Sequence, residues 1–284
     1  MTPDGLPPLR DVIASLQLSA RKSLSQNFIL DLNLTRKIAR AGGPLEGVSV
    51  IEIGPGPGGL TRALLLEGAA RVAVIERDER CLPALEQIAA HYPGRLDIII
   101  GDALQANYDE LAARLAPPVR LAANLPYAIA TPLVVAWLKT PKWPPWYDCM
   151  VLMFQREVAE RLLAPRGSKA YGRLSVLAQW RASIKVAFHL PPRAFTPPPK
   201  VASSVVVLTP KAILDEPCDT AMFEAVTSAA FGQRRKMLRT SLKPVLGDVV
   251  ATLDSLGIRA DARAEDLSYS DFCRIAAVSI NRTT

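Results

Sequence analysis

The sequence predicts an α/β fold in which a doubly wound sheet of parallel strands is followed by a smaller domain made only of helices. From residue 48 onward, short β-branched apolar runs alternate with longer stretches that have leucine and alanine at helical spacing. This alternation is typical of successive βα units. After Pro210 the strand pattern stops and only helical patterns follow. We therefore expect a first domain at residues 1–209 and a second at residues 210–284.

The individual elements follow from the same patterns. Seven runs have the composition of strands, at residues 48–53, 71–76, 96–100, 119–123, 149–154, 183–188 and 203–208. Helical spacing predicts helices at residues 60–67, 81–91, 108–115, 220–231, 234–242, 245–256 and 270–278. We expect residues 1–47 to form a helical segment ahead of the sheet that also contacts the partner.

Composition excludes several classes of protein. The 284 residues are 49% hydrophobic and 21% charged, which is unlike the composition of a disordered chain. No apolar run approaches the ~20 residues that cross a bilayer, and the N-terminus lacks the features of a secretory signal, so we expect a cytoplasmic protein without membrane association. The four cysteines and two histidines are too dispersed for a disulfide framework or a zinc site. We expect free thiols and no bound metal.

The formal net charge of +7 is unevenly distributed. Residues 155–200 contain nine basic and two acidic side chains, and residues 225–247 contain five basic and no acidic ones. Such foci suit an anionic partner, although they also occur as solvated helix faces.

A glycine-dense turn directly follows the first expected strand. It contains Gly54, Gly56, Gly58 and Gly59. Glycine lets backbone N–H groups approach a ligand closely, and ligands bind at the carboxyl edge of such sheets. Because Gly54, Gly56 and Gly59 also fit the dinucleotide-binding pattern, the turn alone leaves a nicotinamide or flavin cofactor open.

Polar residues end the next three expected strands. Glu76 ends the second strand, Asp102 follows the third and Asn124 follows the fourth. A carboxylate at Glu76 could accept both ribose hydroxyls, and one at Asp102 suits an adenine amino group. These side chains would converge on one crevice. Either acid alone could instead cap the helix that follows it.

Together these motifs resemble those of the ribosomal RNA adenine dimethyltransferases of the KsgA/RsmA type, which are Rossmann-like class I enzymes that use S-adenosylmethionine (SAM). The resemblance covers nearly the whole chain, and the motifs that carry it are Ser25–Ile29, Glu52–Gly58, Glu76, Gly101-Asp102, Asn124–Tyr127, Phe195–Ser203 and Phe231–Lys236. It implies SAM contacts at Asn27, Ile29, Gly54, Gly56, Glu76, Asp102 and Asn124. Ile29 stands where the family usually has leucine, and the loop at residues 142–146 is slightly longer than expected.

The tetrapeptide Asn124-Leu125-Pro126-Tyr127 would carry the chemistry that this resemblance implies. An adenine amine is a poor nucleophile because its lone pair is delocalised into the ring. The Asn124 side-chain oxygen and the Leu125 carbonyl could accept its two N–H groups and free the lone pair, while Pro126 stiffens the turn and Tyr127 stacks on the base. We expect Phe195 on the opposite face of the adenine, although a phenylalanine before a proline run is often a loop anchor. No histidine belongs to this set, which argues against metal-assisted or histidine-relayed chemistry.

The resemblance also implies the partner and the product. The substrate would be the small-subunit (16S) rRNA of an immature 30S subunit, and two adjacent adenosines in a loop would each receive two methyl groups. We expect a monomer in which residues 21–26 close over SAM. The residues that we expect to bind RNA are Lys200, Arg234, Arg235, Lys236, Arg239 and Lys243.

Three other functions remain open from the sequence. A large-subunit rRNA adenine methylase of the macrolide-resistance type would share the catalytic motifs, but the motif at Phe231–Lys236 favours the small-subunit enzyme. A non-catalytic RNA-binding assembly or transcription factor could retain the fold. An NAD-dependent oxidoreductase would use the glycine turn, but we find no hydride-site histidine or Tyr/Lys pair after it.

Overall fold

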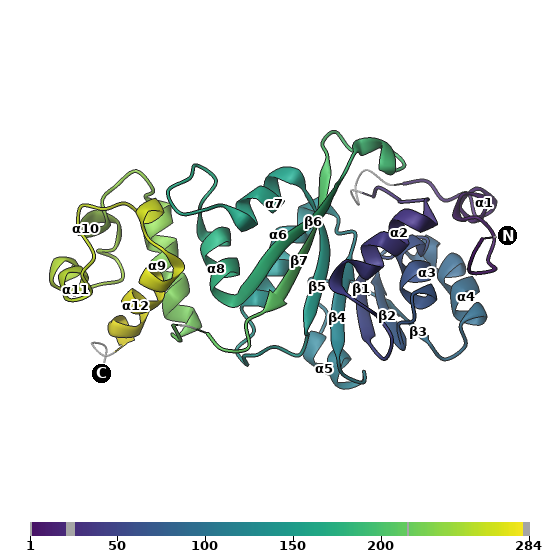
Figure 1. Cartoon of the computed structure of the whole chain (residues 1–284), viewed down its shortest axis with the longest axis horizontal. Helices are drawn as coiled ribbons and strands as arrows, with labels where there is room; N and C mark the ends of the chain where they lie inside the picture. The colour runs from purple at the N-terminus through teal and green to yellow at the C-terminus, as the bar shows by residue number, and fades with distance from the viewer. Residues whose placement is uncertain (1, 21–25, 215, 281–284) are drawn as a thin grey trace. The chain divides into compact units, whose positions relative to one another are not determined.

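The computed structural model describes residues 2–20, 26–214 and 216–280, and its central feature is one twisted sheet (Figure 1). The strand order in the described part is β3–β2–β1–β4–β5–β7–β6. The strands are β1 (Ser49–Ile53), β2 (Arg71–Glu76), β3 (Leu96–Ile100), β4 (Val119–Ala123), β5 (Cys149–Gln155), β6 (Ala182–Leu190) and β7 (Ser203–Pro210). Each of the seven runs expected from the sequence forms a strand.

Strands β1 to β5 pair in parallel, as expected, whereas β7 is antiparallel to β5. The expected fold class is confirmed, and the antiparallel strand lies at the end of the sheet formed by the last two strands of the chain. Residues 191–202, which connect β6 to its neighbour β7, contain a single short 3₁₀ turn at Pro192–Ala194. A parallel crossover normally needs a longer connection, so this stretch of sequence already differs from the earlier βα units.

The centre of the sheet is buried on both faces. All five residues of β1 are buried, and in β2 only Arg71 is exposed. Continuous apolar strands of this kind are typical of parallel sheets covered by helices. In Figure 1 the covering helices lie beside β1, β2 and β3, and they include α2 (Leu32–Ala39), α3 (Gly59–Leu66) and α4 (Leu82–His91). Two further short helices of this region are α1 (Leu9–Ser15) and α5 (Tyr108–Ala113).

Contacts divide the chain into two compact units. The first contains the sheet and comprises Met1–Val134, Pro145–Ala159 and Lys185–Pro210. The second comprises Val135–Pro144, Glu160–Ile184 and Lys211–Thr284. Its last stretch begins beside the boundary that the sequence suggested, while its other two stretches come from within the first 209 residues.

Helices dominate the second unit. It contains α8 (Arg173–Arg181), α9 (Thr220–Gly232), α10 (Leu238–Ser241), α11 (Val249–Ser255) and α12 (Tyr269–Ile280), and the ends of α6 (Tyr127–Leu138) and α7 (Arg156–Leu163). Aromatic side chains form its core: the rings of Trp180 and Phe223 lie 4.3 Å apart and those of Phe231 and Phe272 5.6 Å apart. Such pairs contribute both buried area and ring–ring attraction.

The helix expected at residues 234–242 is much shorter in the structure. A turn occupies the residues before Met237, and α10 spans only Leu238–Ser241. The backbone N–H groups of Leu238 and Arg239 donate to the carbonyls of Ala262 and Ala260, at 2.8 and 3.0 Å. These long-range bonds bring a second segment against the start of α10, and this pairing cannot be seen in a local sequence pattern.

Candidate active site

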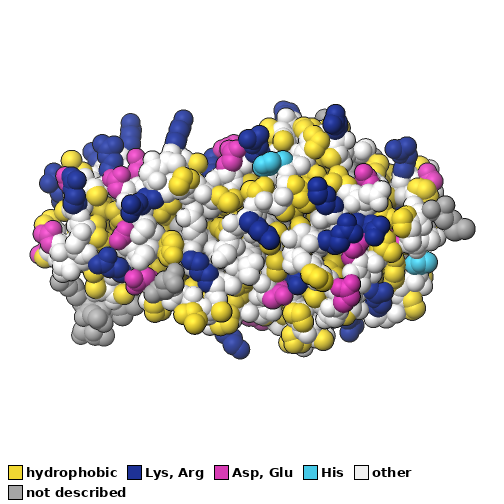
Figure 2. Space-filling view, viewed as in Figure 1, with side chains coloured by type: hydrophobic (Ala, Val, Ile, Leu, Met, Phe, Trp, Pro, Cys, Tyr) yellow, Lys and Arg dark blue, Asp and Glu magenta, His cyan; other side chains and the backbone are white. Residues whose placement is uncertain are grey.

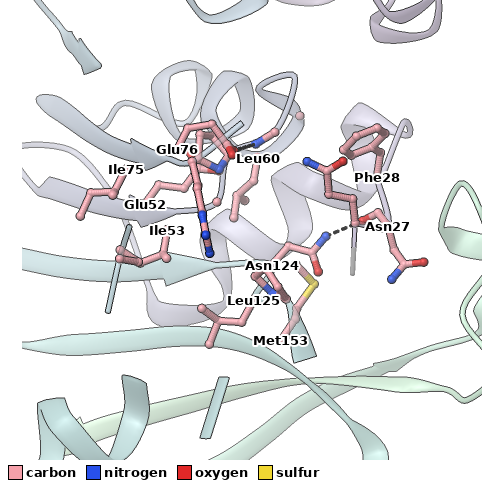
Figure 3. A pocket seen from close by; sticks show the side chains of 18 of the residues that line it. Asn27, Phe28, Glu52, Ile53, Leu60, Ile75, Glu76, Asn124, Leu125 and Met153 are labelled. Atoms are coloured by element: carbon pink, nitrogen blue, oxygen red, sulfur yellow. Dashed lines mark hydrogen bonds between the residues drawn. The ribbon is translucent and has the colours of Figure 1, made fainter. Parts of the chain in front are cut away.

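A cavity of about 260 Å³ lies at the carboxyl ends of β1, β2 and β4 and beside the turn that follows β3 (Figure 3). Its lining includes side chains from Glu76, Asp102 and Asn124, the three polar residues that the sequence placed at strand ends. Backbone of the glycine turn and residues 26–29 complete the wall. The convergence of strand ends on one crevice agrees with the general position of ligands in open α/β sheets.

The glycine turn needs glycine at specific positions. Gly56 has φ +55° and Gly58 has φ +88°, in the region that side chains other than glycine rarely adopt. A Cβ at Gly58 would lie 2.2 Å from the Cδ1 atom of Ile88, so helix α4 packs directly on this backbone. A Cβ at Gly56 would lie 3.1 Å from the ring of Phe28. The turn therefore packs between helix α4 on one side and Phe28 on the other, and its backbone faces the cavity.

The carboxylate of Glu76 is held rigidly at the end of β2. It accepts hydrogen bonds from the backbone N–H of Gly56 at 2.8 Å and from that of Asp78 at 2.7 Å. Burial raises the pKa of Glu76, and these backbone bonds act in the opposite direction. The backbone of Arg77 contributes a further bond to this carboxylate. A carboxylate offers about four acceptor positions, so Glu76 keeps capacity to accept a hydrogen bond from a hydroxyl group that enters the cavity.

Asp102 both stabilises the turn after β3 and lines the cavity. One carboxylate oxygen accepts from the backbone N–H of Leu104 at 2.9 Å, which stabilises the turn after β3. The other lies 3.4 Å from the guanidinium of Arg77. Both Asp102 and Arg77 line the cavity, so the turn presents a carboxylate to the ligand as well as stabilising its own backbone.

Glu52 is a lining residue that we did not single out from the sequence. It lies within β1, is 1% exposed and accepts a hydrogen bond from the hydroxyl of Thr61 at 2.6 Å. Burial raises its pKa to about 8, despite that hydrogen bond, and the nearby charge of Glu76 adds to the effect. The signal in the sequence that could have identified Glu52 was an acidic residue within a mostly apolar strand.

Asn124 has a fixed orientation at the end of β4. Its Nδ2 atom donates to the backbone carbonyl of Asn27 at 2.8 Å, as drawn in Figure 3. Because the amide nitrogen is used in this way, the side-chain oxygen is the group available for a ligand. Leu125 and Pro126 follow Asn124 along the cavity wall. The structure thus presents an amide acceptor and the adjoining turn to the same space.

Tyr127 begins α6 and borders the same cavity. Its hydroxyl lies 2.8 Å from the hydroxyl of Ser203, the first residue of β7. Burial raises the pKa of Tyr127 above its ordinary value, with the Ser203 bond opposing the shift. The phenol is therefore protonated at neutral pH and is held by the sheet.

The segment at residues 27–28 joins the site to the β6–β7 connection. On one side the Asn27 carbonyl accepts from Asn124. On the other, Phe28 and Thr196 exchange two backbone hydrogen bonds, of 2.9 and 2.8 Å. Ile29 is 5% exposed and borders the cavity next to them. Residues 21–25, which include Ser25 and most of the segment expected to close over the cofactor, lie outside the described residues.

Phe195 is not at the cavity. It is 3% exposed and packs in the hydrophobic core with residues such as Ile29 and Leu190. In this conformation its ring is a loop anchor, and stacking on a base would require the loop to move. Lys200, five residues further along, is exposed.

The basic residues between Arg234 and Lys243 fall into two kinds. The Arg234 guanidinium donates to the Glu265 carboxylate at 2.7 Å and to the carbonyls of Lys169 and Ser168 at 2.9 and 3.1 Å. It is committed to internal contacts, which weakens the expectation that it binds RNA. The exposed basic side chains of this region are Arg235, Lys236, Arg239 and Lys243.

Figure 2 shows Lys and Arg side chains gathered along an edge of the second unit, on the side where Figure 1 labels α10. In the described ranges, no helix is both long and apolar enough to cross a membrane. Among the same residues, no three His, Cys, Asp or Glu side chains are grouped to hold a metal ion. All four cysteines are free thiols, as expected.

Strand order and cavity define the general class of this protein. A parallel sheet that ends in an antiparallel β7, inserted between β5 and β6, with its ligand cavity over the glycine turn after β1, is the Rossmann-like fold of class I methyltransferases. Solved structures agree with this class. The structure of a dimethyladenosine transferase from Plasmodium falciparum matches with a TM-score of 0.72 and 25% identity, over 86% of this chain and 94% of that one. The fold of the 23S rRNA methyltransferase ErmE also matches, with a TM-score of 0.65 and 24% identity, over 90% of this chain and 100% of that one.

Sequence comparison then identifies the family. The profile of ribosomal RNA adenine dimethylases matches residues 17–281. Two relatives, from Ruegeria sp. (strain TM1040) and Rhodopseudomonas palustris (strain TIE-1), are each 60% identical over 273 residues and are called "Ribosomal RNA small subunit methyltransferase A". The alignments cover 96% of this chain and 96% and 94% of those proteins. The chain belongs to the ribosomal RNA adenine dimethylase family, and it is a methyltransferase.

Proposed function

We propose that this enzyme transfers methyl groups from SAM to the exocyclic amine of adenines in a loop of small-subunit (16S) rRNA during assembly of the 30S subunit. Two adjacent adenosines would each receive two methyl groups. The observation that carries the chemistry is the amide of Asn124, whose nitrogen is bonded to Asn27 so that its oxygen is left as an acceptor at the cavity. The names of the relatives that are 60% identical over nearly the full chain support the choice of RNA.

The cavity fits SAM in its shape and its polar groups. Gly54 and Gly56 have no side chain to occupy the cavity, and the Glu76 carboxylate has acceptor capacity for the ribose hydroxyls. Asp102 lies where a carboxylate can accept from an adenine amino group, and Asn27 and Ile29 supply the opposite wall. When bound, SAM supplies an electrophilic methyl group on a sulfonium sulfur.

The residues of the chain prepare the amine for this electrophile. The Asn124 oxygen and the Leu125 carbonyl accept its two N–H groups and draw the nitrogen away from conjugation with the ring. The ring of Tyr127 stacks on the base, which contributes about 1–3 kcal/mol. The Tyr127 phenol is protonated and hydrogen-bonded to Ser203, so it does not act as a base. No strong base is needed, because the amine nitrogen would become positively charged on taking the methyl group and would then lose its extra proton to water, while S-adenosylhomocysteine leaves. Positioning therefore supplies most of the rate.

The same acceptors allow a second transfer. After the first methyl group is added, one N–H remains on the amine, and either the Asn124 amide oxygen or the Leu125 carbonyl can accept it. An amide oxygen has two lone pairs, so it tolerates a change in the direction of approach. This step fits a dimethylated product.

Binding of the RNA would use exposed basic side chains outside the cavity. Arg235, Lys236, Arg239 and Lys243 form one such group in the second unit, and Lys200 stands on the β6–β7 connection in the first. Phosphate contacts of this kind supply affinity without reading sequence. An enzyme of this function would work in the cytoplasm, and we propose that it acts as a monomer.

One experiment tests the function and separates it from large-subunit methylation. The full-length protein is incubated with labelled SAM and with immature 30S subunits, mature 30S subunits or 50S subunits, and the RNA is digested and analysed by mass spectrometry. We expect dimethyladenosine only in RNA from the immature 30S particles. Label in 50S RNA would support the large-subunit alternative, and absence of label with intact RNA binding would support a non-catalytic assembly factor.

A further inference from the structure

Residues 2–18 form a defined part of the first unit. These residues, here called the N-terminal strap, consist of a turn at residues 2–6, the helix α1 and a turn at Leu16 and Gln17 that leads to Leu18. Three apolar side chains fix the strap to the body, since Leu9, Val12 and Leu18 are each 7–8% exposed. The strap precedes every sequence motif described above, and it belongs to the segment at residues 1–47 that we expected from the sequence to contact the partner.

A buried ion pair fastens the strap to helix α3. The carboxylate of Asp4 accepts from Nε of Arg62 at 2.6 Å and from its Nη2 at 2.7 Å, and the two side chains are 0% and 4% exposed. Nη1 of Arg62 donates to the carbonyl of Pro7 at 2.7 Å. The guanidinium is thus enclosed by the turn of the strap. Burial opposes ionisation of Asp4, but the bonds and charge of Arg62 hold the pKa of this carboxyl below its ordinary value.

Arg62 stands in the first turn of the helix that begins at the glycine turn. Its backbone N–H donates to the carbonyl of Gly58 at 3.0 Å. The ion pair therefore ties the strap to the same backbone that cradles the cofactor. Removing one partner of such a pair leaves a charge buried without compensation, which is strongly unfavourable.

Leu9 carries the strap into the cavity wall. Its side chain lines the cavity together with Gly59, and a Cβ on Gly59 would lie 3.1 Å from the Cδ2 atom of Leu9. Leu18 is buried to a similar extent but does not line the cavity. Part of the cavity wall is therefore formed by the N-terminal strap, and the contacts of the strap described above hold this part of the wall in position.

We propose that the N-terminal strap is part of the cofactor-binding site, with Leu9 as a contact residue for SAM and with Asp4 and Arg62 as positioning residues that hold Leu9 against the glycine turn. This inference rests on the proposed use of SAM. It adds that the strap forms one wall of the cofactor site. Loss of this wall weakens binding of SAM and leaves the methyl transfer at Asn124 unchanged.

Leu9→Ala and Leu18→Ala form the matched pair that tests the contact. Both variants delete the same atoms from a buried leucine of the strap. We expect the dissociation constants for SAM and S-adenosylhomocysteine, measured by calorimetry on the full-length protein, to rise about five- to tenfold in Leu9→Ala and to stay within about twofold in Leu18→Ala. The KM for SAM should rise in Leu9→Ala, while kcat and the KM for RNA should not change. Equal dissociation constants in the two variants would overturn the proposal.

Asp4→Asn tests the positioning role, with the double variant Asp4→Leu/Arg62→Met as its control. The single change leaves the Arg62 charge buried, whereas the double change removes the pair without leaving a charge. We expect weaker binding of S-adenosylhomocysteine in Asp4→Asn and recovery of most of the affinity in the double variant. Trypsin should cleave at the exposed Arg10 faster in Asp4→Asn, and S-adenosylhomocysteine should protect this bond in the unaltered protein.

The outcomes separate this proposal from the proposed function. If the unaltered protein binds neither SAM nor S-adenosylhomocysteine, the proposed function fails, and the strap proposal fails with it. If it binds both, and Asp4→Asn lowers only the melting temperature with unchanged ligand affinity and unchanged protection of Arg10, the strap is structural and only the present inference is overturned.

Discussion

Asn124 illustrates how a single side chain can be oriented by one hydrogen bond. Its nitrogen is bonded to the Asn27 carbonyl, and its oxygen is thereby left as an acceptor at the cavity. The sequence indicated the importance of Asn124, because a polar residue at a strand end belongs to the ligand edge of the sheet. It gave no sign of the Asn27 bond, since the two residues are far apart in the chain. The orientation of the amide comes from the tertiary structure alone.

Asn124→Ala should abolish most turnover and spare the cofactor site. We expect kcat to fall about 10²- to 10³-fold, by analogy with loss of one polar group that stabilises a transition state. Stability should fall by about 1 kcal/mol, because the Asn27 carbonyl loses its donor. The measurements are single-turnover methylation, calorimetry with S-adenosylhomocysteine and thermal melting. Tyr127→Phe serves as a comparison, since it keeps the ring and should retain turnover within a few-fold. Near-normal turnover in Asn124→Ala would remove its assigned role.

Glu52 gives the folded state a specific dependence on pH. Its pKa is raised from 4.5 to about 8 in the folded protein. The protonated carboxyl is favoured by folding, so the contribution of Glu52 is fully present below about pH 4.5 and is lost as pH rises toward about 8. The slope reaches at most about 1.4 kcal/mol per pH unit.

Glu52→Gln should flatten this dependence, because glutamine cannot ionise. We expect the melting temperature of the unaltered protein to fall more between about pH 6 and about pH 8 than that of Glu52→Gln. The exposed residue Glu86 provides a control, and Glu86→Gln should follow the unaltered protein. Parallel curves for all three proteins would show that Glu52 is ionised in the folded state at neutral pH.

At the scale of elements, sequence patterns located strands more accurately than helices. The runs at residues 71–76 and 119–123 form strands with those limits, because most of their apolar residues are buried on both faces of the sheet. Helix α6 was not expected, since its sequence starts directly after Pro126 and contains Pro132. Its start depends on how the Asn124 turn is held by the sheet, and a local pattern does not contain that information.

The region of α10 shows the same limit for charged residues. All five basic side chains between residues 225 and 247 looked equivalent in the sequence. The structure distinguishes Arg234, which bonds to Glu265 and to two carbonyls, from its exposed neighbours. The ion pair with the distant Glu265 therefore decides whether Arg234 is available to RNA, and its position next to other basic residues in the sequence does not.

Two sets of substitutions test this distinction at α10. The triple variant Arg235→Ala/Lys236→Ala/Arg239→Ala should lower the slope of log binding constant against log salt by about two, at about 0.7 for each lost contact to single-stranded RNA. Arg234→Ala should instead lower the melting temperature and leave the slope nearly unchanged. Filter binding at several salt concentrations and thermal melting provide the measurements. An unchanged slope in the triple variant would place the RNA on another surface.

At the scale of the whole molecule, sequence reasoning recovered the general architecture and the main contacts of the cavity. Glu76, Asp102 and Asn124 do converge, because the carboxyl ends of neighbouring parallel strands meet at one edge. The prediction for Phe195 does not agree with its burial in the core, and Glu52 and Leu9 were not found. Long-range packing decides whether each of these side chains points into the core or toward the cavity, and a local sequence pattern does not contain that information.

The double attachment of residues 27–28 has a thermodynamic consequence. Asn27 is bonded to the end of β4, and Phe28 is bonded to Thr196 on the β6–β7 connection. A ligand that binds at the cavity and orders residues 27–28 also orders their contact with the β6–β7 connection. A ligand that binds at that connection has the same effect on the contact with the cavity. Cofactor and RNA should therefore bind cooperatively, and the coupling must be reciprocal: saturating RNA should tighten S-adenosylhomocysteine by the same factor by which S-adenosylhomocysteine tightens RNA. A factor of one, measured by titrating each ligand with and without the other, would mean that the segment is already fully ordered in the free enzyme.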